Sequence, residues 1–177
     1  MGFGDSITAG HTFSDLHVGA NDSYFDMLAC SENSPIRDIG NAGAPGATTT
    51  VLRTRLQKVI DAHPDEVLVL AGTNDIFLGE PENAIRNLEQ MRQRLDEAGI
   101  RYKFGTLPPS NLHPDATVKM NESIREWAAD RGVDLIDYYT PLADADGGYR
   151  QGLSDDGMHP STKGAAVMAA TAAAALR

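Results

Sequence analysis

The chain has 177 residues, a length that suits one domain with a single core, and we expect that domain to span residues 1–177. Its 15 Lys and Arg residues against 25 Asp and Glu residues give a formal net charge of −10, which argues against nucleic acid or an anionic membrane surface as the main partner. No apolar run approaches the length of a membrane span, so we expect no stable membrane association.

Short apolar runs predict five strands. Residues 1–4 are the stub of a first strand, and residues 36–41 are predicted to form a second. The run at 66–71 is almost continuously apolar, as expected of a strand that is covered on both faces. Two further strands are predicted at 101–107 and 133–138.

Helical patterns separate these runs. Helices are predicted over residues 24–30, 49–62, 81–98, 116–131 and 160–176. The third of them has Pro81 at its start and Gly99 just after its end, the asymmetry that helices prefer. The alternation of strand and helix predicts a parallel sheet with helices on both faces, whose functional sites lie in loops beyond the carboxyl ends of the strands.

The thiol content and the chain start bear on the cell compartment. Cys30 is the single cysteine, so no intrachain disulfide is expected, and its helix-like surroundings predict a buried, inert thiol. No signal peptide precedes the first motif, which slightly favours the cytoplasm. A leader removed before the first residue would give the same beginning, so secretion stays open.

A serine near the start and a histidine near the end are candidates for nucleophile and base. Ser6 follows the first strand stub, and Asp156 and His159 lie in the long loop before the last helix. A carboxylate three residues from the imidazole can hold its Nδ1–H and leave Nε2 free to accept a proton. Pro160 suits the first helical position, which would place the histidine at the helix entrance. The alternative reading is that these residues only cap helices or turns.

Two further loops offer donors for an oxyanion. Gly43 can bring its backbone N–H close to a substrate because it has no Cβ, and Asn74 can offer its side-chain amide. Asp75 is expected to cap or brace its loop rather than to act chemically. The loop at 41–46 lacks the Gly-x-Gly-x-x-Gly spacing and contains Pro45, so neither a dinucleotide-binding loop nor a P-loop is predicted. Ordinary turns are the alternative for both segments.

Other candidates complete the predicted site. Phe77 and Leu78 follow the oxyanion asparagine and are predicted to line an acyl pocket, with core packing as an equal alternative. Asp5 is included as a substrate-binding residue. The remaining three candidates, His11, Asp15 and His17, have no accompanying ligand cluster, so no metal site is predicted. Thr8 stands where a Gly-x-Ser-x-Gly elbow has its second glycine, which argues against the common α/β-hydrolase type.

Taken together, these segments resemble the GDSL-type esterases of the SGNH hydrolase superfamily. The four family blocks are matched by Gly4-Asp5-Ser6-Ile7, Asn41-Ala42-Gly43, Gly72-Thr73-Asn74-Asp75 and Asp156-Gly157-Met158-His159-Pro160. The resemblance implies a three-layer α/β/α sandwich of the flavodoxin type with a central parallel sheet of about five strands. Ile7 replaces the leucine of the family name. The first strand has only three or four residues, so we expect a gap in the sheet.

The resemblance also assigns roles. It makes Ser6 the nucleophile, His159 the base and Asp156 its partner, with the N–H groups of Ser6 and Gly43 and the Asn74 amide as the oxyanion hole. This arrangement needs no metal and no organic cofactor. We therefore expect a serine esterase that acts on small esters with short, acetyl-type acyl groups. The alternatives are a lysophospholipase or acyl thioesterase of the same fold, a non-catalytic binding module, and a flavodoxin-like nucleotide binder; the oligomeric state stays open.

Overall fold

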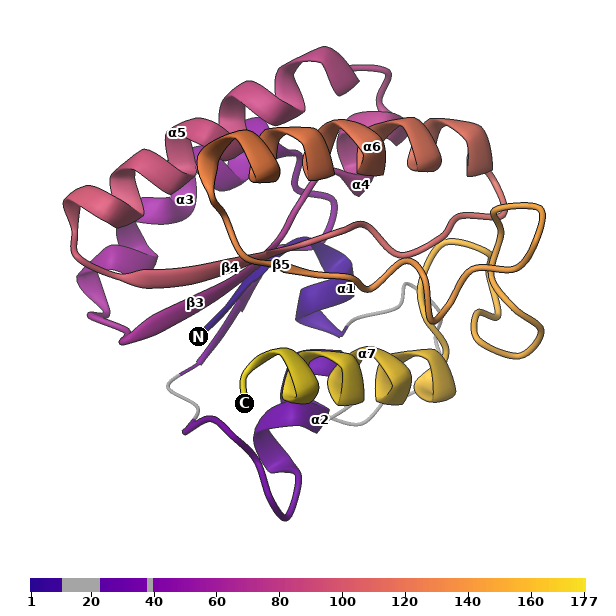
Figure 1. Ribbon diagram of the computed structural model, residues 1–177, viewed down its shortest axis with the longest axis horizontal. Coiled ribbons are helices and arrows are strands. Elements are labelled where there is room, and N and C mark those ends of the chain that lie inside the picture. The colour runs from indigo at the N-terminus through magenta and orange to yellow at the C-terminus, as the bar shows by residue number, and fades with distance from the viewer. Residues whose placement is uncertain (11–22, 38–39) are drawn as a thin grey trace.

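Five short parallel strands form the centre of the protein. The computed structural model describes residues 1–10, 23–37 and 40–177 (Figure 1). The strands are β1 (Gly2–Gly4), β2 (Asn41–Gly43), β3 (Glu66–Leu70), β4 (Arg101–Gly105) and β5 (Leu135–Ile136). They pair in the order β2-β1-β3-β4-β5, and every pairing is parallel. This confirms the predicted α/β fold, its five-stranded parallel sheet and its very short first strand.

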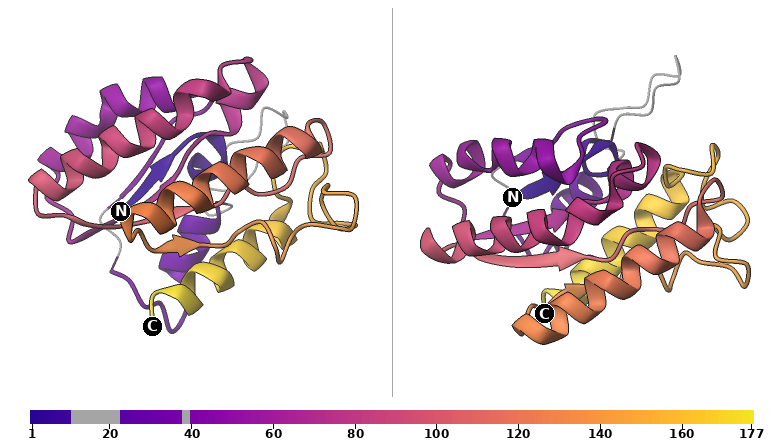
Figure 2. Two further views of the ribbon diagram at one scale, coloured as in Figure 1. Left: turned by 45° about the horizontal axis from the view of Figure 1, so that its top comes forward. Right: turned by 90° about the horizontal axis from the view of Figure 1, so that it is seen from above.

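Helices cover both faces of the sheet. On one face lie α3 (Thr49–Asp61), α5 (Ala84–Glu97) and α6 (Pro114–Arg131), and on the other lie α2 (Tyr24–Cys30) and α7 (Thr162–Ala175), as Figures 1 and 2 show. The buried apolar side chains of both layers form one continuous core, which includes Trp127. A short 3₁₀ turn, η1 (Pro81–Asn83), precedes α5. Because the helices lie on the two faces of the sheet, they leave open the side where the strands begin and the side where the strands end.

The short first strand leaves no gap where one was expected. All three residues of β1 pair with both β2 and β3. Met1 extends the pairing, because its ammonium group donates to the Glu66 carbonyl at 2.8 Å and its carbonyl accepts from the Leu68 N–H at 3.0 Å. The Phe25 ring packs where a Cβ on Gly2 would stand, with 2.7 Å between the two positions. An aromatic side chain from α2 thus fills the space beside the shortened strand.

Several predicted boundaries are corrected by the structure. The strand predicted at 36–41 begins only at Asn41, and the last helix begins at Thr162, where the Ser161 side chain caps it by accepting from the Gly164 N–H. His159 therefore lies in the loop before this helix rather than at its entrance. The Cys30 thiol is exposed rather than buried, because it is the last residue of α2.

Two short helices at strand ends were not predicted. They are α1 (Ser6–Ala9) and α4 (Thr73–Phe77), and each starts within three residues of the end of a strand. With four and five residues they are too short to show an apolar period in the sequence. Both begin at the carboxyl edge of the sheet, so they set the directions of the first side chains that follow β1 and β3.

Candidate active site

A tight turn places Ser6 at the first position of α1. The Asp5 side chain caps this helix by accepting a hydrogen bond from the Ile7 N–H at 2.9 Å. A Cβ on Gly4 would stand 2.3 Å from the Leu70 carbonyl oxygen, so only glycine fits this close approach to β3. Ser6 itself is buried, and its N–H belongs to the first turn, where helices have no internal acceptor.

The two ends of the chain meet at this serine. Ser6 Oγ lies 2.9 Å from His159 Nε2, although the residues are 153 positions apart in the sequence. His159 Nδ1 lies 2.7 Å from Asp156 Oδ2. With the proton on Nδ1, the imidazole donates to the carboxylate and accepts at Nε2 from the serine hydroxyl. The structure thus brings together the three residues that were predicted as nucleophile, base and partner.

The Asp156 carboxylate is held as an anion. Its Oδ1 accepts hydrogen bonds from the backbone N–H groups of Met158 at 2.8 Å and His159 at 2.7 Å. Partial burial raises the pKa of Asp156, but the hydrogen bonds from the His159 side chain and these backbone groups outweigh it and leave the pKa below its usual value. A negative carboxylate next to Nδ1 fixes the tautomer of the ring.

Three residues that sequence reasoning missed hold the histidine loop. Ser154 Oγ donates to the His159 carbonyl at 2.6 Å and accepts from the Gly157 N–H at 2.9 Å. The Asn111 N–H donates to the Gly157 carbonyl, and the Tyr149 hydroxyl donates to the Met158 carbonyl. The contacts of Ser154 and Tyr149 lie within the loop that follows β5. The contact of Asn111 joins this loop to the one that follows β4, which no local pattern in the sequence could indicate.

Asn74 and Gly43 differ in what they can offer to an oxyanion. The Asn74 side chain uses one N–H on the Ala47 carbonyl at 3.1 Å, and its NH₂ group has a second N–H. Gly43 donates its single N–H to the Asn41 side chain at 3.0 Å. A Cβ on Gly43 would lie 2.3 Å from the backbone nitrogen of Ala9, so the residue packs against α1. The structure therefore argues against the predicted donor role of Gly43.

Gly46 lies in the same loop and is exposed. Its φ of +73° is left-handed, and a Cβ there would have no atom within 4 Å. Among the described residues, none accepts a hydrogen bond from its N–H. The Ala47 carbonyl next to it receives the Asn74 amide, so the loop and the asparagine are held together. The sequence prediction chose Gly43, two residues after Asn41, and passed over Gly46, which stands five residues after it.

Asp75 braces this loop as expected. Its two carboxylate oxygens accept from the Thr49 N–H at 2.9 Å and from the Thr49 hydroxyl at 2.5 Å. The Asn87 side chain donates to the same hydroxyl at 2.9 Å. Burial raises the pKa of Asp75, and the hydrogen bonds from Thr49 oppose this effect. The network ties α4, which carries Asn74, to the start of α3 behind the loop.

The predicted substrate contacts fare unequally. Asp5 has no exposed surface, so a direct contact with substrate is wrong for this residue; its carboxylate caps α1 instead. Leu78 is 66% exposed, and Phe77 is half-buried with its ring edge-on to His113 at a centroid distance of 4.7 Å. His11, Asp15 and His17 lie outside the described residues. Within the described residues there is no group of three His, Cys, Asp or Glu side chains that could hold a metal ion.

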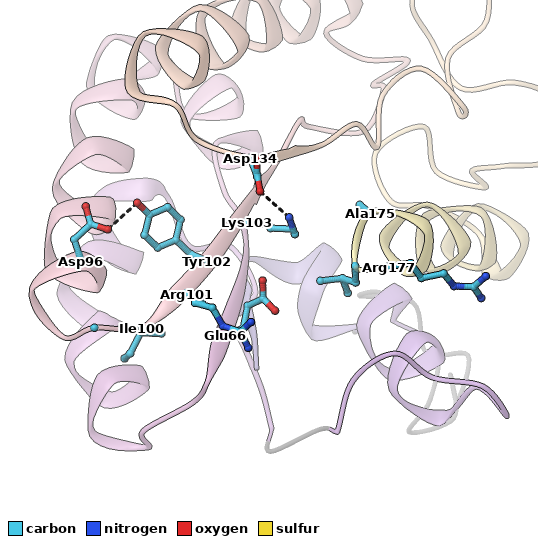
Figure 3. Close-up of a pocket in the computed structure, with 11 residues that line it drawn as sticks. Glu66, Asp96, Ile100, Arg101, Tyr102, Lys103, Asp134, Ala175 and Arg177 are labelled. Carbon is cyan, nitrogen blue, oxygen red and sulfur yellow. Dashed lines mark hydrogen bonds and ion pairs between the residues drawn. The ribbon is translucent and has the colours of Figure 1, made fainter.

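A cavity of about 630 Å³ lies on the opposite side of the sheet, where the strands begin. It is lined by residues at the amino ends of β3 and β4 and by the last residues of the chain, including Glu66, Arg101 and Arg177 (Figure 3). Its Lys103 is paired with Asp134 at 3.0 Å. None of the triad residues lines this cavity, so we locate the reaction at the carboxyl edge and not here. In residues 1–10, 23–37 and 40–177, no helix has the length and apolar character needed to cross a membrane.

The fold is shared with solved structures of known families. A protein from Desulfitobacterium hafniense assigned to the G-D-S-L family of lipolytic proteins has a TM-score of 0.85 at 22% identity, over 98% of this chain and 97% of that one. TesA has a TM-score of 0.77 at 19% identity over 99% and 96%. The psychrotrophic esterase EstA from Pseudoalteromonas sp., solved inhibited by monoethylphosphonate, has a TM-score of 0.75 at 20% identity over 97% and 92%.

Sequence comparison identifies the family. A search of curated proteins found no match. The sequence pattern of the GDSL-like lipase/acylhydrolase family, however, matches residues 3–167, which include the serine turn, the asparagine of α4 and the histidine loop. This match over nearly the whole chain shows that the protein belongs to the GDSL-like lipase/acylhydrolase family and is a carboxylic ester hydrolase.

Proposed function

We propose that the protein is a serine esterase that hydrolyses small esters with short acyl groups through a Ser6–His159–Asp156 triad and an acyl-enzyme. The observation that carries this proposal is the unbroken chain of hydrogen bonds from the serine hydroxyl through the imidazole to the carboxylate, at 2.9 Å and 2.7 Å. A nucleophile within bonding reach of a base that is itself oriented by a third group is the arrangement that acyl transfer requires.

In the first half of the reaction, Ser6 Oγ attacks the ester carbonyl while His159 Nε2 takes its proton. Asp156, held negative by its backbone hydrogen bonds, stabilises the imidazolium that forms. The imidazolium then protonates the leaving alcohol, and the ester bond breaks to leave an acylated serine. In the second half, His159 takes a proton from water while the water oxygen attacks the acyl carbonyl. The bond between Ser6 Oγ and the acyl group then breaks, the imidazolium returns its proton to Oγ, and the carboxylic acid leaves.

The negative oxygen of each tetrahedral intermediate needs donors that are in place beforehand. We assign this role to the Ser6 N–H at the start of α1 and to the second N–H of the Asn74 amide. In place of Gly43, whose N–H is engaged by Asn41, we assign the third donor to the N–H of Gly46. The contact of Asn74 with the Ala47 carbonyl supports this choice, because it holds the asparagine against the Gly46 loop.

The rim near Asn74 supports short acyl groups. The Phe77 ring packs edge-on against His113, and Leu78 stands exposed beside it. We propose that these side chains contact the acyl group and limit its length. Lysophospholipids, one of the alternative substrates, carry long acyl chains, so a rate series of p-nitrophenyl esters from acetyl to dodecanoyl separates them from short esters. A maximum at chains beyond about eight carbons would overturn the short-acyl assignment.

A fluorophosphonate probe tests the mechanism itself. An activated serine is phosphonylated by the probe, whereas a serine in an ordinary turn is not. We expect labelling of the wild type and none of the Ser6→Ala variant, which should fold normally and lose nearly all turnover. Parental hydrolysis of p-nitrophenyl acetate by Ser6→Ala would refute the mechanism, and an unlabelled, inactive wild type would favour the non-catalytic binding module.

A further inference from the structure

Asp5 is an acidic residue that lies next to the proposed nucleophile in the chain and has no contact with solvent. It precedes Ser6 in the chain and has no exposed surface. Its Oδ1 accepts from the Ile7 N–H, but Oδ2 has no hydrogen-bond donor among the described residues. A buried carboxylate oxygen without a partner costs free energy, so neither core packing nor helix capping alone explains an aspartate here. Serine would cap α1 without that cost.

We propose that Asp5 is a positioning residue for the esterase reaction: its carboxylate fixes Ser6 at the start of α1, and its negative charge stabilises the imidazolium that forms on His159. This inference rests on the proposed function, because it needs the histidine to act as the base. The hydrogen bond to Ile7 takes the second N–H of the helix, so the Asp5 carboxylate does not occupy the N–H of Ser6, to which we assign the oxyanion.

The surroundings of Asp5 make its charge selective for the transition state. Among the described residues, four charged or titratable groups interact electrostatically with the Asp5 carboxylate. They are His159, Asp75 on α4, Tyr24 on α2 and Tyr149 in the loop between β5 and α7. Burial raises the pKa of Tyr24 to about 12 and raises that of Tyr149 as well, so both phenols stay neutral. Of these groups, only His159 becomes positive during the reaction. The attraction therefore appears when the proton moves from serine to imidazole, and an interaction that strengthens in the transition state accelerates the step.

The ionisation of Asp5 suits this role. Burial raises the pKa of Asp5 to about 6, and the Ile7 N–H and the charge of His159 partly offset that rise. Above that pH the carboxylate is negative in the range where neutral imidazole serves as a base. The second nearby carboxylate, Asp75, has both oxygens bonded to Thr49, whereas Asp5 keeps one oxygen free.

The test is a pH–rate profile of Asp5→Asn, which keeps the shape and the Oδ1 acceptor and removes the charge. We expect kcat/KM for p-nitrophenyl acetate to fall about tenfold on its plateau, the effect of losing one modest charge interaction. We also expect the acid limb of the profile to move to lower pH, since the variant lacks the carboxyl group that must ionise near pH 6. Asp134→Asn, which removes a charge at the opposite edge of the sheet, should change neither quantity.

The outcomes separate this inference from the proposed function. A plateau and an acid limb equal to those of the wild type would overturn it, and so would a lower plateau with an unmoved acid limb, because a merely structural residue gives that result. If Asp5→Asn does not fold, Asp5→Ser keeps a capping oxygen without the charge and is expected to shift the limb in the same direction. Failure of the probe to label Ser6 in the wild type would instead refute the triad itself.

Discussion

The brace behind the oxyanion asparagine allows a quantitative prediction for Thr49→Val. This substitution keeps the shape of a fully buried side chain and removes one hydroxyl. The hydroxyl donates to Asp75 at 2.5 Å and accepts from Asn87 at 2.9 Å, so its loss leaves a buried carboxylate and a buried amide each short of a partner. A hydrogen bond to a charged group contributes about 1.5–3 kcal/mol, so we expect the free energy of unfolding to fall by about 2–3 kcal/mol.

The matched control is Thr54→Val on the same helix. Its hydroxyl is exposed and donates only to the Val51 carbonyl, so the cost should stay below about 0.5 kcal/mol. Urea unfolding of the two variants measures the difference. Because the brace also holds α4, kcat of Thr49→Val should fall several-fold while KM changes less. Equal unfolding free energies for the two variants would show that the Asp75 network does not hold this end of the molecule.

Three further predictions test the remaining parts. Asn74→Ala should lower kcat by about 10²- to 10³-fold with little change in KM, and an effect confined to KM would remove it from the oxyanion site. Gly43→Ala should destabilise the fold more than Gly46→Ala. A Cβ on Gly43 would lie 2.3 Å from the Ala9 backbone, whereas a Cβ on Gly46 would enter open space, and the only cost there is the backbone strain of a φ of +73°. Thermal unfolding that ranks the two variants in the reverse order would contradict this packing. Because the pKa of Asp5 rises from 3.8 to about 6 on folding, the contribution of this group to stability is present below pH 4 and is lost as the pH rises through 6. Relative to Asp5→Asn, the wild type should lose on the order of 3 kcal/mol of unfolding free energy between pH 4 and 7. A difference between the two proteins that does not depend on pH would contradict the burial of a titrating carboxylate.

That last prediction has a consequence for function. A negative Asp5 lowers the stability of the folded protein at neutral pH, since folding favours its protonated form. Active sites commonly keep groups that are unfavourable for folding, because the same group is needed by the reaction. Asp5→Asn should therefore be a variant that gains stability at pH 7 and loses activity, which is a pairing that a simple helix cap would not produce.

The sequence predicted the order of elements well because strand and helix patterns here are local. The continuous apolar run of β3 and the boundary residues of α2 and α3 are visible without any tertiary information. The helices α1 and α4 were missed because four or five residues carry no period. Both follow the end of a strand, but only α1 has a capping side chain, that of Asp5. The expected gap beside β1 was wrong because the Phe25 ring, from a distant helix, fills it.

The site shows the same division. Ser6, Asp156, His159 and Asn74 could be named from short segments whose residue types each suit one chemical task. The hydrogen bond of the Gly43 N–H could not be predicted, because it depends on the orientation of the Asn41 side chain. The burial of Asp5 could not either, since burial depends on segments that are distant in the sequence and meet only in the folded chain. Asn111 acts through a contact between two loops that follow different strands, which sequence spacing does not encode, whereas Ser154 acts within the histidine loop itself.

The most direct test of the central claim is to map the residue that a fluorophosphonate modifies. Mass spectrometry of the digested, labelled protein should place the phosphonyl group on Ser6, and substitution of His159 by Ala should slow that labelling by orders of magnitude, since the hydroxyl then has no base. Modification at another serine, or labelling of Ser6 at an undiminished rate without His159, would contradict the account.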